Sequence, residues 1–133
     1  MNNALNLIGR LLIAALFLPA GLAKLSGFEG TVSYIESVGL PLPAVAAAAA
    51  LALEILGSVA LIVGFQTRIV AAVLAVFTLV ASIFFHAFWA AAPEQVFVQQ
   101  LLFFKNIGVI GGLLVLVSTG AGAWSIDAKK AAQ

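Results

Sequence analysis

The chain has 133 residues, of which 64% are hydrophobic and only 8% charged, and its formal net charge is +1. A soluble domain of this length would lack polar surface at that composition, so we expect one integral membrane domain over residues 1–133. Cysteine is absent and there is one histidine, which excludes Fe–S ligation, thiol redox chemistry and bis-histidine haem within this chain. No basic patch points to a nucleic acid.

Four apolar segments follow one another, at about 5–25, 43–63, 69–90 and 101–119. Each is close to the roughly 20 residues that cross a bilayer core about 30 Å thick. Backbone groups in lipid must bond within the segment, so the segments are expected to be helices. The first is expected to be an uncleaved span, because Arg10 lies inside the apolar run and the run is long for a signal peptide. The sequence thus predicts an all-α, antiparallel bundle of four transmembrane helices.

Lysine and arginine predict the orientation. Arg68 lies in the turn between the second and third segments, and Lys129 and Lys130 lie in the tail. The connections 26–42 and 91–100 contain glutamate but neither lysine nor arginine. By the positive-inside rule both termini are expected in the cytoplasm, with Arg68 as a topology anchor.

The first connection on the predicted outer side is patterned. Its apolar residues recur at helical spacing, which indicates a short helix on the outer surface of the membrane. These residues are Phe28, Val32, Ile35 and Val38.

Glu54 stands about eleven residues into the uncharged second segment. A carboxylate at bilayer depth costs about 2.5–3.5 kcal/mol on insertion, so it needs a partner or water. The candidate cationic partners are Arg10, Lys24, His86 and Lys105, and the depth count favours Lys105 from above or Arg10 from below. The alternative is that such a pair only fixes the register of the helices.

Counting about 1.5 Å per residue from the helix ends places several polar side chains at similar depth in the outer half of the bundle. This predicts a polar pocket that opens outward, with Glu54 as its floor. Lys24 and Arg10 have a second interpretation as snorkelling side chains, and His86 as a hydrogen-bonded interface residue. The predicted pocket residues are Arg10, Lys24, Glu54, His86, Lys105 and Asn106.

Small residues occupy the same helical faces and favour close helix packing. The glycines predicted to pack are Gly21, Gly57, Gly108 and Gly112. The sequence contains no metal-ligand spacing, nucleophile–base pair or nucleotide motif, so it identifies no catalytic residue and no metal site.

Short motifs spread along nearly the whole chain resemble those of the DoxX family of small four-helix bacterial membrane proteins. They are Gly9-Arg10, Pro19–Leu25, Gly27-Phe28, Glu54 with Gly57, Gly64–Arg68, Phe104–Asn106, Gly111-Gly112 and Gly120–Asp127.

The resemblance implies a multi-pass protein of the bacterial inner membrane, in contact with lipid. Some similar proteins are membrane subunits of quinone-reducing systems, and others are associated with oxidative-stress complexes, so a quinone is the cofactor to expect. Two alternatives stay open. One is a non-enzymatic scaffold that docks a soluble redox or stress enzyme. The other is a small-solute or proton carrier that acts as a homodimer.

Overall fold

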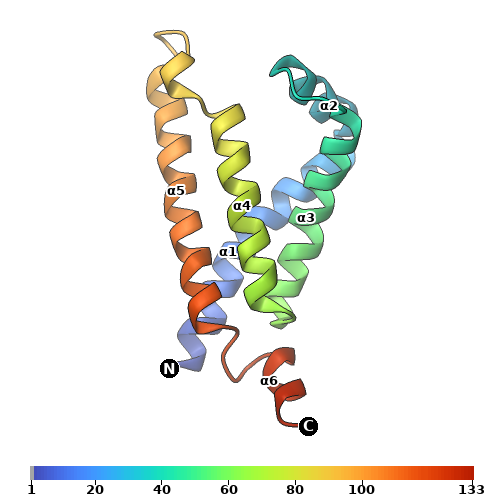
Figure 1. Cartoon of the computed structure of the whole chain (residues 1–133), viewed down its shortest axis with the longest axis vertical. Coiled ribbons are helices and arrows are strands. Elements are labelled where there is room, and N and C mark those ends of the chain that lie inside the picture. The colour runs from blue at the N-terminus through green and yellow to red at the C-terminus, as the bar shows by residue number, and fades with distance from the viewer. Residues whose placement is uncertain (1) are drawn as a thin grey trace.

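The computed structural model describes residues 2–133, and within that range the chain forms helices and no strands (Figure 1). This confirms the predicted all-α class. The elements are α1 (Asn3–Ser26), α2 (Phe28–Ser37), α3 (Pro43–Val63), α4 (Thr67–Phe85), a 3-10 turn η1 (Phe88–Ala90), α5 (Val96–Thr119) and α6 (Ile126–Ala131).

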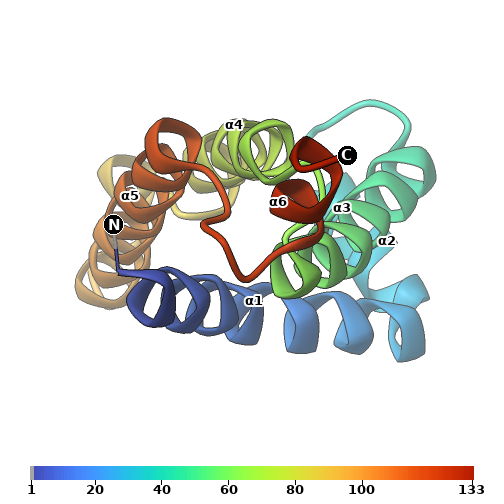
Figure 2. The ribbon, with the colours of Figure 1, turned by 90° about the horizontal axis from the view of Figure 1, so that it is seen from below.

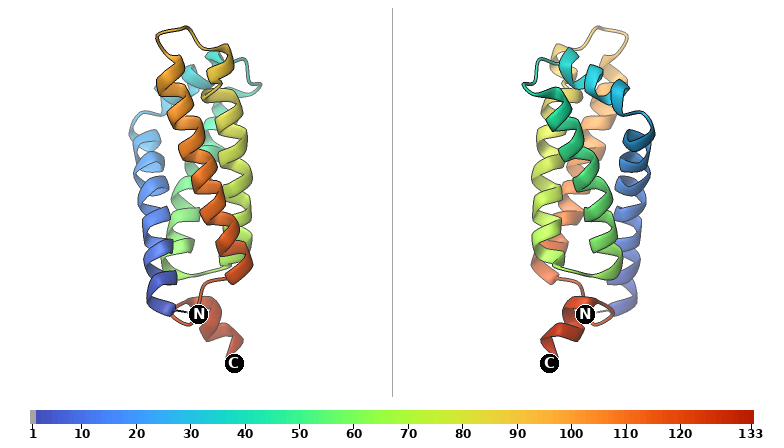
Figure 3. Two further views of the ribbon diagram at one scale, coloured as in Figure 1. Left: turned by 90° about the vertical axis from the view of Figure 1, so that its left-hand side faces the viewer. Right: turned by 90° about the vertical axis from the view of Figure 1, so that its right-hand side faces the viewer.

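The four long helices α1, α3, α4 and α5 run alternately up and down (Figure 1). Each lies in a segment long and apolar enough to cross a membrane. Both chain termini lie at one end of the bundle, which we call the termini end, and α2 lies across the opposite end, the α2 end (Figure 3). The predicted four-span architecture is therefore confirmed.

The bundle consists of two closely packed helix pairs, α1 with α3 and α4 with α5. Toward the α2 end the pair α4–α5 diverges from α3 (Figure 1). The buried core includes Phe17, Leu61, Leu74 and Leu113. Gly57 lets α4 approach α3, because a Cβ there would lie only 3.2 Å from the Leu74 methyl carbons.

A helix forms over the patterned first connection, as the spacing predicted. In α2, Ile35 is buried and the other residues of its apolar stripe are half-buried. The stripe therefore faces the protein, with α2 packed mainly on α3. Its placement on a membrane surface stays a prediction.

Two helix boundaries differ from the predicted segments. The third span ends as an α-helix at Phe85, where the His86 N–H bonds back to the Ser82 carbonyl, and η1 then continues to Ala90. The fourth begins at Val96 instead of about 101. The hydropathy pattern missed this turn because it contains Gln99 and Gln100.

Candidate functional site

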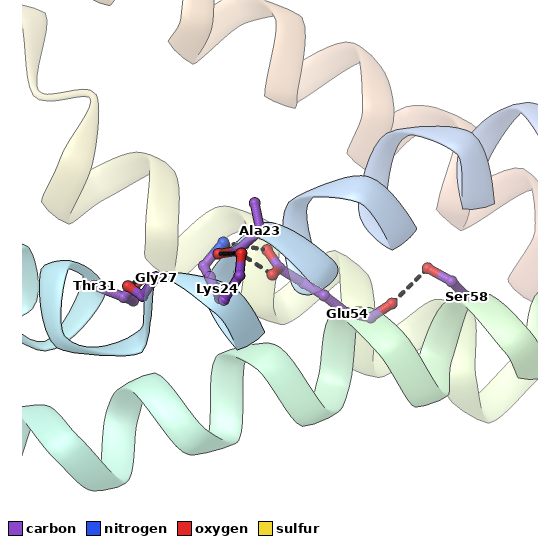
Figure 4. Close-up of polar contacts among 7 residues, drawn as sticks. Ala23, Lys24, Gly27, Thr31, Glu54 and Ser58 are labelled. Carbon is purple, nitrogen blue, oxygen red and sulfur yellow. Dashed lines mark hydrogen bonds and ion pairs between the residues drawn. The ribbon is translucent and has the colours of Figure 1, made fainter.

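An ion pair joins α1 to α3 in the half of the bundle nearer α2 (Figure 4). The Lys24 ammonium lies 2.9 Å from Glu54 Oε2 and 3.1 Å from Oε1. The Glu54 side chain is 7% exposed and that of Lys24 26%. Gly21, one turn earlier on α1, permits this approach, because a Cβ there would lie 2.7 Å from Ile55 Cγ1 on α3.

The partner of Glu54 is one of the four predicted candidates, but neither of the two that the depth count favoured. Its partner is Lys24, whereas neither Lys105 nor Arg10 forms a salt bridge with it. Depth along the membrane normal had placed Lys105 within reach, but Lys105 projects from α5, which is not packed against α3. The structure supports the pocket interpretation of Lys24 and not the alternative of a snorkelling side chain.

The ion pair borders a cavity of ≈ 600 Å³ between the helices. Side chains from α1, α2, α3, α4 and α5 line it. Its apolar wall includes the rings of Phe17, Phe77 and Phe85, and Ala20 and Ala81 leave space between them. The lining residues that carry polar side chains are Lys24, Thr31, Tyr34, Glu54, Thr78, His86, Lys105 and Asn106.

The cavity thus brings together five of the six residues predicted for the pocket. Asn106 is buried, and its amide Nδ2 donates to Ser82 Oγ at 3.0 Å. The His86 imidazole Nδ1 lies 2.9 Å from Gln99 Oε1, an acceptor, so this nitrogen donates. The first bond joins α4 to α5, and the second joins the residue after α4 to α5. Both bonds hold that part of the cavity wall in place.

Lys105 differs from the other cations of the spans. It borders the cavity, is exposed, and makes no hydrogen bond or ion pair to any of residues 2–133. Its side chain is therefore available to an incoming group.

Arg10 does not line the cavity, and its predicted place in the pocket was wrong. It is fully buried near the termini end, where Nη1 donates to the carbonyls of Leu61 and Ile62 at 2.8 and 3.0 Å. Nη2 donates to the Trp124 carbonyl at 2.6 Å, and Nε to Asn6 Oδ1 at 3.0 Å. Arg10 caps the C-terminus of α3, whose last carbonyls lack helical partners.

Two further charged residues complete the capping at this end. Arg68 Nη1 donates to the carbonyls of Val117 and Ser118, each at 2.6 Å, at the end of α5. Asp127 accepts from the backbone N–H groups of Gln66 and Thr67, at 2.7 and 2.9 Å, at the start of α4. The role of Arg68 as a topology anchor stays a prediction.

These capping contacts bring together, at one end of the bundle, short motifs that lie far apart in the sequence. The segment 120–133 crosses the termini end of the bundle (Figure 2). Gly64 has a positive φ of 70°, and a Cβ there would overlap Ser125 Cβ and approach Arg10 Nη1. Sequence analysis missed Asp127 and Asn6 as functional partners. The sequence carried no direct signal for these contacts, because the partners lie 51 to 114 residues from the helix ends that they cap.

Of the four glycines predicted to pack, two lie at close helix contacts and two do not. Gly21 and Gly57 lie at helix contacts, whereas Gly112 is near only Ile13 Cδ1, where a Cβ would lie 3.7 Å away. A Cβ at Gly108 would meet nothing within 4 Å. Gly108 therefore makes no close helix contact in the chain described here.

Comparison with known proteins agrees with the resemblance to the DoxX family. The DoxX family model matches residues 5–87. The chain is 40% identical over 124 residues to the inner membrane protein YqjF of Escherichia coli, which covers 91% of this chain and 88% of the relative. It is 35% identical over 121 residues to the inner membrane protein YphA of the same organism, covering 91% and 86%.

A shorter similarity reaches a eukaryotic protein. The Surfeit locus protein 4 homolog of Schizosaccharomyces pombe is 37% identical over 71 residues, which covers 52% of this chain and 24% of that protein. No solved structure matches. With four candidate membrane spans, a family model that matches more than half of its length and two such relatives, the chain belongs to the DoxX family of integral membrane proteins.

Proposed function

We propose that this protein binds a lipid-soluble, quinone-type ring in the cavity beside the Lys24–Glu54 pair and serves as a redox-associated component of the bacterial inner membrane. The observation that carries the proposal is the cavity itself. Its ≈ 600 Å³ falls within the range of small-molecule sites, about 300–1,000 Å³, and it combines an apolar wall with a few convergent polar groups.

The lining residues fit such a ring. The rings of Phe17, Phe77 and Phe85 offer apolar faces to a planar ligand. The ammonium of Lys105 is available to donate a hydrogen bond to a ring oxygen. Glu54, held by Lys24, is the one carboxylate among the lining residues and would exchange a proton with that oxygen. A bound quinone would supply the two-electron chemistry that side chains lack.

The electrons must come from or go to another component. The chain has no cysteine and one histidine, so its own side chains provide no Fe–S or bis-histidine haem centre. A soluble redox or stress enzyme that docks on the membrane domain would fill this role. With both termini in the cytoplasm, the cavity would open in the outer half of the membrane.

A cavity-filling substitution tests the binding directly. Ala81→Phe places a ring in the cavity, whereas Val80→Phe adds the same ring next to it on α4 at a residue that does not line the cavity and is 46% exposed. Both variants would be purified in detergent, checked for helix content and titrated with a short-chain benzoquinone.

We expect saturable binding to the wild type and to Val80→Phe, and binding at least about tenfold weaker to Ala81→Phe, because the filled cavity excludes the ligand. Equal affinities of all three proteins would mean that the quinone merely partitions into the micelle and would overturn the proposal.

A further inference from the structure

We infer that the cavity prefers a ring whose oxygen is ionised, and that Lys105 is the residue that selects it. The inference rests on the proposed function, since it concerns the ligand of the same cavity. It names the class of ligand more narrowly, as an acidic quinone or a phenol-like ring with an apolar body.

The charges that line the cavity do not balance. Lys24 and Lys105 contribute two ammonium groups, and Glu54 contributes the one carboxylate among the lining residues. The Glu54 carboxylate is held by Lys24, with both of its oxygens close to that ammonium. The carboxylates of α2, Glu29 and Glu36, do not line the cavity. One positive charge, that of Lys105, is left without a counterpart in the wall.

The other cations placed in the spans all have partners. Arg10 and Arg68 donate to backbone carbonyls at helix ends, and Lys24 pairs with Glu54. Lys105 has no such contact within residues 2–133, although it lies inside a helix that can cross the membrane. A charge in an apolar environment is costly unless it is paired. An anionic oxygen on the ligand would supply the missing partner.

The apolar wall limits which anion fits. Phe17, Phe77 and Phe85 offer ring faces, so a small hydrated anion would lose water there and gain little. A planar ring with one ionised oxygen would pack against the apolar wall and pair with Lys105.

A matched pair of ligands separates charge from shape. The two ligands would be 1,4-naphthoquinone and its 2-hydroxy derivative, which is ionised at neutral pH and has nearly the same size. Both would be titrated into wild type, Lys105→Gln, Lys105→Arg and Lys129→Gln in a neutral detergent. Lys129 is an exposed residue of α6, far along the chain from the cavity, and serves as the matched control.

We expect the wild type and Lys129→Gln to bind the hydroxylated ring about tenfold more tightly than the neutral one, as a charge-assisted contact would give. Lys105→Gln should bind the two rings equally, and Lys105→Arg should retain the preference. Passive uptake by neutral micelles would favour the neutral ring, so it cannot imitate this result.

Three outcomes would overturn the inference. If the wild type binds both rings equally, or if Lys105→Gln keeps the preference, Lys105 does not select an anion, and the proposed quinone binding stands on its own. If neither ring binds to the wild type and the Ala81→Phe comparison also shows no specific binding, both proposals fail.

Discussion

The ammonium of Lys24 on α1 lies 2.9 Å from Glu54 Oε2 on α3, and this contact joins two neighbouring helices that can each cross the membrane. Removing one partner leaves the other charge unpaired in a largely buried position. We therefore expect Lys24→Gln and Glu54→Gln each to lower the free energy of unfolding in detergent.

The double variant should lose less than the sum of the two single losses, with a coupling of about 1–3 kcal/mol. Thermal unfolding of the four proteins completes this cycle. Additive losses would show that the two side chains do not interact and would contradict the observed pairing.

Arg10 should be the most sensitive charged residue of the bundle. Its guanidinium is fully buried and reaches three backbone carbonyls and Asn6. Arg10→Lys keeps the charge, but an ammonium has only three donors and lacks the planar, five-donor geometry of the guanidinium. We expect a loss of about 3–5 kcal/mol for Arg10→Ala and a substantial loss for Arg10→Lys, measured by denaturant or thermal unfolding. Wild-type stability of Arg10→Lys would contradict the capping role.

Gly64 and Gly108 form a matched pair for the same substitution. Gly64→Ala forces a side chain into the left-handed region at φ 70° and into Ser125, so it should destabilise the fold strongly. Gly108→Ala meets open space within a regular helix and should be neutral or raise stability by up to about 1 kcal/mol.

Unfolding temperatures of the two variants check this expectation. A large loss in Gly108→Ala, together with dissociation of a dimer seen by light scattering, would show that this glycine packs against a second copy of the chain.

The contact of Asp127 with the start of α4 predicts a pH dependence. Partial burial acts to raise the pKa of Asp127, but the hydrogen bonds from Thr67 and Gln66 outweigh it, and the pKa lies below its ordinary value of 3.8. The carboxylate therefore stabilises the fold fully at neutral pH. This contribution falls as the pH drops below the ordinary value and is lost once the pH passes the lowered folded-state pKa.

Asp127→Asn should be less stable than wild type at pH 7, and the difference should shrink as the pH falls into the acid range. Unfolding temperatures measured over a pH series give the comparison. A gap between the two proteins that stays constant or widens in acid would be inconsistent with this role of Asp127.

The sequence predicted the helices well because membrane spans follow from apolar length. The second span, Pro43–Val63, has the bounds expected of it. Counting residues also layered Lys24, His86, Lys105 and Asn106 above Glu54 in the outer half of the bundle, and the structure gathers these residues around one cavity.

The sequence could not supply the contacts between side chains. Depth does not say how far each helix is rotated about its axis, so the count favoured Lys105 or Arg10 over Lys24 as the partner of Glu54. The sequence does not show that the start of α1 and the end of α3 are neighbours. Arg10 was therefore predicted to lie at the pocket and not at the end of α3. The polar residues of the termini end cap helices instead, and that role depends on which helix ends are neighbours.

The most direct test of ligand binding is native mass spectrometry of the protein extracted gently from its membrane, with wild type compared with Ala81→Phe and Val80→Phe. We expect the wild type and Val80→Phe to retain a ring compound of quinone-like mass and Ala81→Phe to lack it. If the wild type carries no such compound, or if all three proteins carry it equally, the cavity is not its binding site, and the Lys24–Glu54 pair is a structural contact between α1 and α3.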